Sequence, residues 1–337
     1  MSEKNNTATV AKDPRSLWTK YTSLNGSSIF IAAVIALLLF EVVTPGAFIS
    51  ADTFMMIVRQ QLYIGIIAFG LTLVMLTGNI DLSVGNMLTF LCCVCASVMM
   101  ATNNALLTVA ATMGAGALCG LFNGTLVSYV RLNSFITTLG ASSIFFALAQ
   151  FVSAGTILVI PDNCSETFKF LGRASFGPIS ILIVWFVVVM LILGFLLSRT
   201  VYGQQLYAIG ANPIAARFSG IRYKRNTTIA YVITGLCAGL AAVAMMANSL
   251  SSNPQAASGQ EMEVILCVVL GGCAVNGGKG SVWGTAIGVI FYGILSAGFT
   301  SIGLPLHLQW VVMGAIMLVL LSLDALKGKG VKLWKRK

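Results

Sequence analysis

Charged side chains are scarce in this sequence. Only 9% of the 337 residues are Asp, Glu, Lys or Arg, whereas 57% are hydrophobic and the mean hydropathy is +0.91. A soluble domain usually carries about 25% charged residues, so these few charges exclude a soluble fold of this length. The apolar surplus must face lipid, and the sequence predicts an all-α integral membrane protein.

Side chains that carry chemistry are also few. His307 is the only histidine, and no CxxC pair occurs among the eight cysteines, so the spacing of a metal site is absent. The sequence contains no HExxH motif, no carboxylate dyad and no histidine placed to activate a serine. The stretch "GGCAVNGGKGS", residues 271–281, fails the nucleotide-binding P-loop pattern at both ends, at Cys273 and at Gly280. We therefore predict a tight turn there, no cofactor, no metal and no enzymatic activity of the chain itself.

Apolar runs divide the chain into ten predicted membrane-spanning helices, since about 20 helical residues cross the hydrocarbon core. The eighth run is short, and we expect it to be either tilted or broken and buried inside the protein. The predicted regions are a tail over residues 1–27, a transmembrane domain over 28–324 and a basic tail over 325–337. The runs cover residues 28–45, 53–77, 82–101, 105–128, 134–154, 178–198, 227–247, 262–276, 282–300 and 307–324.

Basic residues predict the orientation of these spans. Four precede the first run, six follow the last, and five lie in the loop 199–226, whereas the opposite face carries only Lys169 and Arg173. Lys and Arg collect on the cytoplasmic side of membrane proteins, so both termini and the loop 199–226 are predicted to be cytoplasmic. This placement explains the net charge of +10 better than binding to nucleic acid does.

One carboxylate interrupts the apolar sequence. Asp81, in "GNIDLSVGNM", is the only acidic residue between Thr53 and Pro161. A charge at the bilayer centre costs roughly 2.5–3.5 kcal/mol, and a helix cap recovers about 1 kcal/mol of it. Two interpretations stay open. Either Asp81 caps the third span after Gly78 and Asn79 break the second, or it belongs to a path across the membrane or its gate.

Three further polar residues are candidates for such a path. Ser83 follows Asp81 closely, and Asn123 and Gln150 lie in the fourth and fifth runs. Asn123 and Gln150 either hydrogen-bond neighbouring helices together or line the path. Glu261 and Glu263 stand at the predicted outer mouth of the eighth run, where they either meet basic residues of a partner or are solvated.

The loop 199–226 contains a predicted docking helix. In "LYAIGANPIAARFSGIRYKRN", Pro213 suits the first helical position and Asn212 the cap, so Ile214 to Phe218 should form a short helix that Gly220 closes. A solvated loop has no need of Ile and Phe unless a partner packs there. We predict a docking site for a cytoplasmic partner; the alternative is a basic segment lying on anionic lipid.

Four motifs together resemble the permeases of ABC importers for ribose and related monosaccharides. They occur in the order of that family and cover most of the chain from Arg59 to Asp324. The sequence departs from the family at Asn79, where a second glycine is frequent, near Asn133 and Ser134, where prolines are frequent, and after Asn212, where acids are usual. The motifs are "GNIDLSVG" from Gly78, "FNGTLVSYVRLNSFITTLG" from Phe122, "YAIGANPIAARFSGI" from Tyr207 and "GQEMEVILCVVLGGCAVNGGKGSVWGT" from Gly259.

The resemblance implies a ten-span permease of the bacterial inner membrane, similar in architecture to the cobalamin importer. Two permease subunits, identical or related, would form the path, two cytoplasmic ATPase subunits would drive it, and a periplasmic binding protein would deliver the solute. Glu261 and Glu263 would then face the binding protein. The coupling helix seated in the ATPase would contain Asn212, Ala215, Ala216, Arg217 and Gly220.

Two alternatives remain at this point. The same kind of permease could carry another small polar solute, such as a nucleoside or a sugar-derived signal, because the separate binding protein usually sets specificity in this family. An ion-driven secondary transporter would need a buried acid or histidine relay, for which only Asp81 qualifies.

Overall fold

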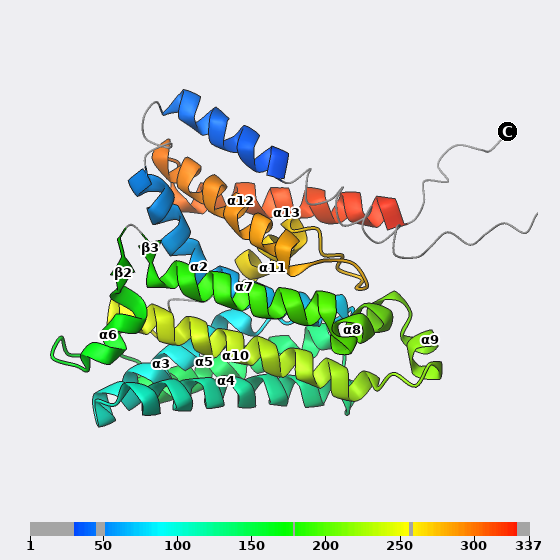
Figure 1. The fold of residues 1–337 in the computed structure, drawn as a ribbon, viewed down its shortest axis with the longest axis horizontal. Coiled ribbons are helices and arrows are strands. Elements are labelled where there is room, and N and C mark those ends of the chain that lie inside the picture. Colours follow the sequence, from blue (N-terminus) through cyan, green and yellow to red (C-terminus); the bar gives the residue numbers. More distant parts are fainter. Residues whose placement is uncertain (1–29, 45–50, 178, 256–258, 329–337) are drawn as a thin grey trace, which may run out of the picture.

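Helices make up most of the computed structural model, which describes residues 30–44, 51–177, 179–255 and 259–328 (Figure 1). The predicted tail 1–27 and most of the predicted tail 325–337 lie outside these residues. Two short antiparallel strand pairs join β1 (Leu158–Val159) to β4 (Ser251–Ser252) and β2 (Ser175–Phe176) to β3 (Ile179–Ser180). The helices are Phe30–Val43, α2 (Ala51–Leu76), α3 (Val84–Thr102), α4 (Ala105–Ser128), α5 (Ser134–Ser153), α6 (Glu166–Arg173), α7 (Ile181–Arg199), α8 (Val201–Ala211), α9 (Pro213–Phe218), α10 (Tyr223–Ser249), α11 (Gln260–Leu270), α12 (Val282–Ser301) and α13 (Leu306–Gly328).

A helix lies over each apolar run that the sequence predicts as a span. Within the described chain six of them, α3, α4, α5, α7, α10 and α12, are long and apolar enough to cross a membrane. The prediction of a predominantly helical membrane protein is confirmed, and the count of ten spans stays a prediction. Apolar side chains cover much of the outward surface, including Leu106 and Phe151, as contact with lipid requires.

The helix over the eighth predicted run is shorter than that run. α11 has 11 residues, which span about 16 Å and do not cross the hydrocarbon core alone. The helix ends at Leu270 because Gly271 and Gly272 begin a turn, with Gly272 in the left-handed region at φ 82°. Residues Val264 to Val268 are buried, so the interpretation of a short helix inside the protein is confirmed.

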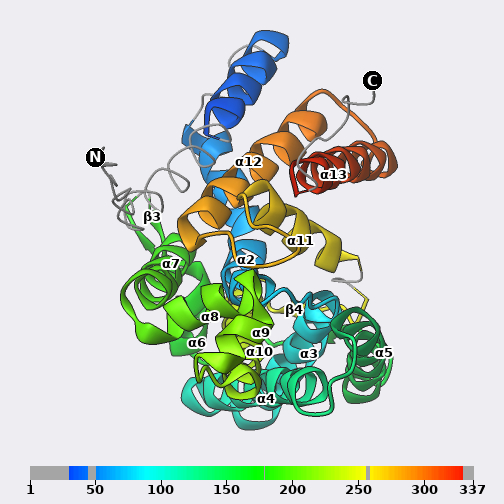
Figure 2. The ribbon, with the colours of Figure 1, turned by 90° about the vertical axis from the view of Figure 1, so that its right-hand side faces the viewer.

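Helix α2 occupies the centre of the bundle. It packs against α7, α10, α11 and α12, which surround it in the end-on view of Figure 2. From Ile66 to Leu76 its side chains are almost fully buried. The helix Phe30–Val43 lies at the edge, where Phe40 meets Phe299 of α12 edge-on with 5.7 Å between ring centroids.

Glycines bring α4 and α10 into backbone contact. A methyl group at Gly116 would overlap the carbonyl oxygen of Gly235, and one at Gly235 would overlap the carbonyl oxygen of Gly116. Gly120 lies just as close to the backbone of α10, and a Cβ at Gly124 would lie 2.9 Å from Thr228 Cα. Without a hydrophobic driving force in lipid, such close packing supplies much of the attraction between helices.

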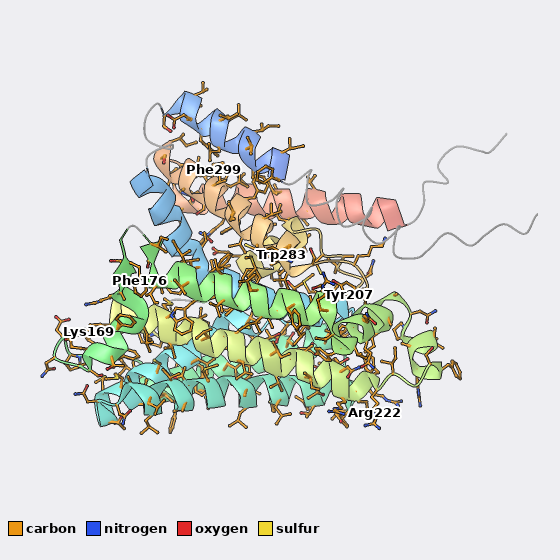
Figure 3. The ribbon with its side chains drawn as sticks, in the orientation of Figure 1. Lys169, Phe176, Tyr207, Arg222, Trp283 and Phe299 are labelled. Carbon is orange, nitrogen blue, oxygen red and sulfur yellow. The ribbon has the colours of Figure 1, made fainter. Side chains whose placement is uncertain are left out.

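The two predicted faces of the membrane lie at opposite ends of the bundle. In Figure 3, Lys169 and Phe176 mark one end, and Tyr207 and Arg222 mark the other. The first end carries α6 and the β2–β3 hairpin, and the second carries α8 and α9. This separation agrees with the orientation that the basic residues predict.

Two helices, α6 and α8, lie in segments that the sequence predicts as loops. α8 begins after Thr200, whose extended backbone ends α7 and whose Oγ1 accepts from Gly203 N at 3.2 Å. Its buried residues Gly203, Leu206 and Ile209 stand three positions apart, a spacing typical of helices. α6 lies at the opposite end of the bundle and is anchored there by Phe168, which is fully buried.

Cysteine labelling tests the orientation. All native cysteines are buried, so we expect little background. Arg222→Cys should react with a membrane-impermeant maleimide only after the membrane is opened, whereas Phe176→Cys, at a position 57% exposed, should react in intact cells. The reverse pattern would show that the topology is inverted.

Substitutions of glycine test the α4–α10 contact. Gly116→Ala should destabilise the folded protein by about 1–3 kcal/mol, because overpacking forces the two backbones apart. Gly114→Ala is the matched control, since its Cβ would meet nothing within 4 Å. Thermal unfolding of the purified variants in detergent measures the difference. Equal melting temperatures for the two variants would contradict the close packing.

Candidate functional site: a buried break and an exposed docking helix

A buried break, residues 77–83, separates α2 from α3. α2 ends at Leu76, and Gly78 adopts a left-handed backbone conformation at φ 78°. Glycine adopts this conformation without the steric cost that other residues incur. The prediction that Gly78 and Asn79 interrupt the second span is confirmed.

Asp81 lies in this break and is fully buried. Its Oδ1 accepts hydrogen bonds from Ser83 N at 2.9 Å and from Ser83 Oγ at 2.6 Å. Asn123, on α4, places its Nδ2 at 3.4 Å from both carboxylate oxygens and donates to Ser83 Oγ at 2.7 Å. The structure therefore brings together three of the four predicted path residues, Asp81, Ser83 and Asn123. Among the described residues, Asn123 Oδ1 has no hydrogen-bond partner.

The prediction that Asp81 caps the third span is wrong. α3 begins at Val84, with Ser83 at the cap position and no side-chain bond to the first turn. Asp81 instead closes a turn ahead of the helix, accepting from the backbone two residues on, as Asp does in such turns. The hydrogen bonds of this turn and of Asn123 offset the cost of burying the carboxyl group.

Side chains from other helices pair with the backbone of the break. Leu82 N donates to Thr138 Oγ1 at 3.0 Å, and Ile80 N donates to Ser134 Oγ at 3.4 Å, both on α5. The hydroxyl of Tyr231, on α10, donates to Ile80 O at 3.2 Å. Sequence reasoning missed these partners, since a hydroxyl in an apolar run does not reveal which backbone group it meets.

The turn 271–281 and α8 pack against the same break. Gly278 N donates to Leu76 O at 2.9 Å, and a Cβ at Gly277 would lie 2.7 Å from Gly78 Cα. A Cβ at Gly210, on α8, would overlap Leu76 O and Gly278 N. The tight turn expected for residues 271–281 is confirmed, and its glycines are needed because three backbone segments meet there.

Gln150 and the two acidic residues of α11 lie away from Asp81. Gln150 Nε2 donates to Pro254 O at 3.4 Å, which ties the end of α5 to the segment before α11. Glu261 Oε2 accepts from Gly259 N at 3.1 Å. Glu263 is half-buried and hydrogen-bonds with Tyr292 of α12, so it faces a neighbouring helix. The contact of Glu261 and Glu263 with a binding protein stays a prediction.

The predicted docking helix is present as α9. Asn212 caps it, its Oδ1 accepting from Ile214 N at 3.1 Å and from Ala215 N at 3.0 Å, and Pro213 occupies the first turn. Gly220 ends the segment with φ 79°. The helix begins one residue earlier than predicted, because the ring of Pro213 is already set for helical backbone.

α9 exposes large apolar side chains. Ile214 is 70% exposed and Phe218 is 88% exposed, whereas Ala216 is buried against the protein. Arg217 lies on the same short helix. A helix held by one buried residue and its cap, with Ile and Phe outward, presents an apolar surface to whatever lies beyond this end of the bundle.

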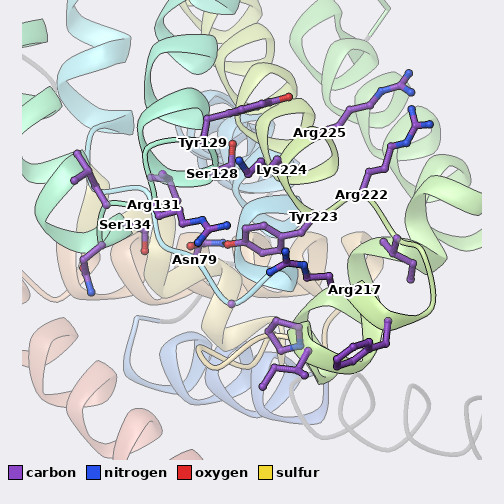
Figure 4. A pocket seen from close by; sticks show the side chains of 18 residues that line it. Asn79, Ser128, Tyr129, Arg131, Ser134, Arg217, Arg222, Tyr223, Lys224 and Arg225 are labelled. Atoms are coloured by element: carbon purple, nitrogen blue, oxygen red, sulfur yellow. The ribbon is translucent and has the colours of Figure 1, made fainter.

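A cavity of about 1150 Å³ lies between α9 and the break. Figure 4 shows Asn79 from the break, Arg217 from α9 and Tyr223 from the start of α10 around it. The loop between α4 and α5 supplies Tyr129 and Arg131. The cavity therefore joins the exposed helix to the buried break.

These features define a multi-pass membrane protein with a polar interruption inside and an exposed apolar helix at one end. The family model described as the branched-chain amino acid transport system / permease component matches residues 53–321. The chain belongs to this family and is a multi-pass protein of the inner membrane.

Three named relatives resemble the chain over most of its length. It is 32% identical over 305 residues to the fructose import permease protein of Rhizobium meliloti, covering 87% of this chain and 83% of that protein. It is 32% identical over 297 residues to the ribose import permease protein of Escherichia coli K12, covering 87% and 92%. The D-allose transport system permease protein of the same organism is 33% identical over 319 residues, covering 93% of each chain. No solved structure matches the chain.

Substitutions at Asp81 test its structural role. Asp81→Ala removes the acceptor of Ser83 N and Ser83 Oγ and leaves Asn123 Nδ2 only its bond to Ser83 Oγ. Each buried donor left unsatisfied costs about 1–3 kcal/mol, so the melting temperature in detergent should fall clearly. Asp81→Asn keeps an acceptor oxygen and should fall less. Thr102→Ala, which removes an exposed hydroxyl bonded to Val98 O and to Asn104 N, is the control. A melting temperature for Asp81→Ala equal to that of the control would contradict this assignment.

Proposed function

We propose that this chain is the permease subunit of an ABC importer. It forms the path for a monosaccharide, a ribose-like sugar, which a periplasmic binding protein delivers and a separate cytoplasmic ATPase drives across the membrane. Membership of the permease family supports this proposal, as do the printed names of its relatives, which include fructose, ribose and allose permeases.

The observation that carries the proposal is the exposure of α9. Ile214 and Phe218 are solvent-exposed apolar side chains at the end of the bundle that the basic residues assign to the cytoplasm. The chain has no nucleotide-binding motif of its own. A separate ATPase subunit that covers these side chains would remove them from water and gain about 25 cal/mol per Å² of apolar surface buried. We assign Asn212, Ala215, Ala216, Arg217 and Gly220 to this coupling segment.

Helix α8 connects the coupling segment to the break. Asn212 links α8 directly to α9. Gly210, two residues before Asn212, touches the end of α2. Tyr207, one turn earlier in α8, donates from its hydroxyl to Gly280 O at 2.7 Å. A displacement of α9 by the ATPase therefore moves α8 against Leu76 and the turn 271–281. ATP binding and hydrolysis act through this contact by favouring one arrangement of the break over another.

The break itself is the proposed gate region of the path. Asp81, Ser83 and Asn123 supply carboxylate, hydroxyl and amide groups in the interior, and Oδ1 of Asn123, which has no hydrogen-bond partner among the described residues, is an acceptor that suits a hydroxyl group. Gln150 is the proposed path residue nearer the outer end. Glu261 and Glu263 form the proposed contact with the binding protein.

The proposed assembly contains a second permease subunit, identical or related, and two ATPase subunits. The proposed topology has ten spans with both termini in the cytoplasm and an architecture similar to that of the cobalamin importer. A helix over each of the ten apolar runs and the opposite placement of Phe176 and Arg222 support this topology.

Reconstitution tests the coupling role of α9. Phe218→Ser should weaken association with the ATPase and lower solute-stimulated ATP hydrolysis several-fold, because its exposed ring supplies much of the apolar contact. Gly220→Ala should act in the same direction, since its left-handed backbone disfavours a side chain. The measurements are ATPase co-purification and hydrolysis in proteoliposomes that also contain the binding protein.

Phe176→Ser is the matched control for this experiment. It removes an exposed phenylalanine at the opposite end of the bundle, so it should leave ATPase association unchanged. Normal coupling in both α9 variants would contradict the proposed docking site, and sugar uptake that continues without ATP hydrolysis would contradict the proposed class of transporter.

A further inference from the structure

The cavity beside α9 is lined by an unusual concentration of positive charge. In a chain with only 9% charged residues, five cationic side chains line this one cavity, and none of the described lining residues is acidic. They come from the α4–α5 loop, from α9 and from the beginning of α10. They are Arg131, Arg217, Arg222, Lys224 and Arg225.

These cations have no acidic partner in the part of the chain that the structure describes. The salt bridge found there joins Lys169 to Glu166 at the opposite end of the bundle. Lys224 lies over the ring of Tyr129, with Nζ 5.3 Å from the ring centroid. The guanidinium groups of Arg131 and Arg217 are exposed and unpaired within the described residues. Charges of one sign gathered in a concave site produce a positive potential that attracts anions.

Two of the cations converge on the same neutral polar groups. In Figure 4 the side chains of Arg131 and Arg217 point from opposite walls toward Asn79 and Tyr223. Asn79 Nδ2 lies 3.4 Å from the hydroxyl of Tyr223. The site therefore combines two guanidinium forks with an amide and a hydroxyl.

We propose that this cavity binds a small phosphate-bearing anion. Guanidinium forks match the geometry of phosphate oxygens, and a phosphate monoester carries about −1.5 to −2 charges at pH 7, which suits several cations better than a single carboxylate does. The volume of about 1150 Å³ admits a small molecule, and the amide and hydroxyl suit a ligand that also carries hydroxyl groups. The phosphate comes either from a soluble monoester such as a sugar phosphate or from a lipid headgroup.

The position of the site gives the ligand a regulatory role, which rests on the proposed function. A phosphate held by both Arg131 and Arg217 ties the α4–α5 loop to the coupling helix. Movement of α9 relative to the bundle then requires that one of these contacts break, so bound phosphate opposes transport. A phosphotransfer reaction that consumes the imported sugar produces ligands of this class, and their accumulation slows further uptake.

Binding is measured first on the purified full-length chain without the ATPase. The protein is placed in nanodiscs of phosphatidylcholine alone, and inorganic phosphate and ribose 5-phosphate are titrated by calorimetry. We expect saturable binding of one ligand per chain. Arg131→Gln should weaken it about tenfold or more, because a charge-assisted hydrogen bond is lost. Arg199→Gln, which removes an exposed arginine of α7 outside the cavity, should leave it unchanged.

Further arms distinguish the source of the phosphate and guard against misfolding. The unmodified protein is titrated with soluble phosphate in nanodiscs that contain phosphatidylglycerol and, in the same buffer, in nanodiscs of phosphatidylcholine alone. If binding is lost only in the nanodiscs that contain phosphatidylglycerol, the occupant is a lipid headgroup at the same site. Arg131→Lys keeps the charge but not the fork, and should retain part of the affinity. The thermal unfolding of each variant shows that it is folded.

Two results would overturn the proposal. One is weak, unsaturable binding that Arg131→Gln and Arg199→Gln reduce equally, which indicates diffuse surface charge. The other is the absence of phosphate binding together with loss of ATPase association in Arg131→Gln, which assigns the cavity to the ATPase subunit. Since the titration needs no ATPase, neither its success nor its failure decides the proposed transport function.

Discussion

Inside the membrane, every backbone N–H and C=O group must find a hydrogen-bond partner within the protein, and the rest of the structure depends on this constraint. Within a helix this need is met automatically, but between α2 and α3 it is not. There the backbone of Ile80 and Leu82 is paired by the side chains of Ser134, Thr138 and Tyr231. Two helices, α5 and α10, thus meet this short segment, and the arrangement of the break is tied to their positions.

Close packing and polar pairing divide the bundle into two kinds of contact. Along α4 and α10 the glycines bring backbones together without room for adjustment, so these helices behave as one body. Around residues 77–83 side chains also hydrogen-bond to the backbone and to one another, with several of these bonds at 3.4 Å. Exchange of such bonds needs small movements only, whereas separating the glycine contact needs helices to part.

Charged side chains are also distributed unevenly between the interior of the bundle and the end that carries α9. Fully buried Asp81 accepts hydrogen bonds from Ser83 and Asn123. The end that carries α9 gathers arginines around a cavity, and these arginines have no acidic partner among the described residues. The exposed apolar side chains of α9 lie beside this cavity, so the proposed partner on α9 and the proposed anion in the cavity would both contact Arg217 and its neighbours.

The sequence by itself determined the class of protein, the position of nearly every helix and the short capped helix α9. Composition excludes a soluble fold, apolar runs of helical length are a local property, and the cap at Asn212, Pro213 and Gly220 involves neighbours only. The tertiary structure decided the rest. It moved Asp81 from a helix cap to a turn, shortened the eighth run at Gly271, and selected Ser134, Thr138, Tyr231 and Gly278 as partners of the break. These contacts join residues far apart along the chain, and the hydroxyl or glycine that makes each of them looks the same in sequence as one that faces its own helix.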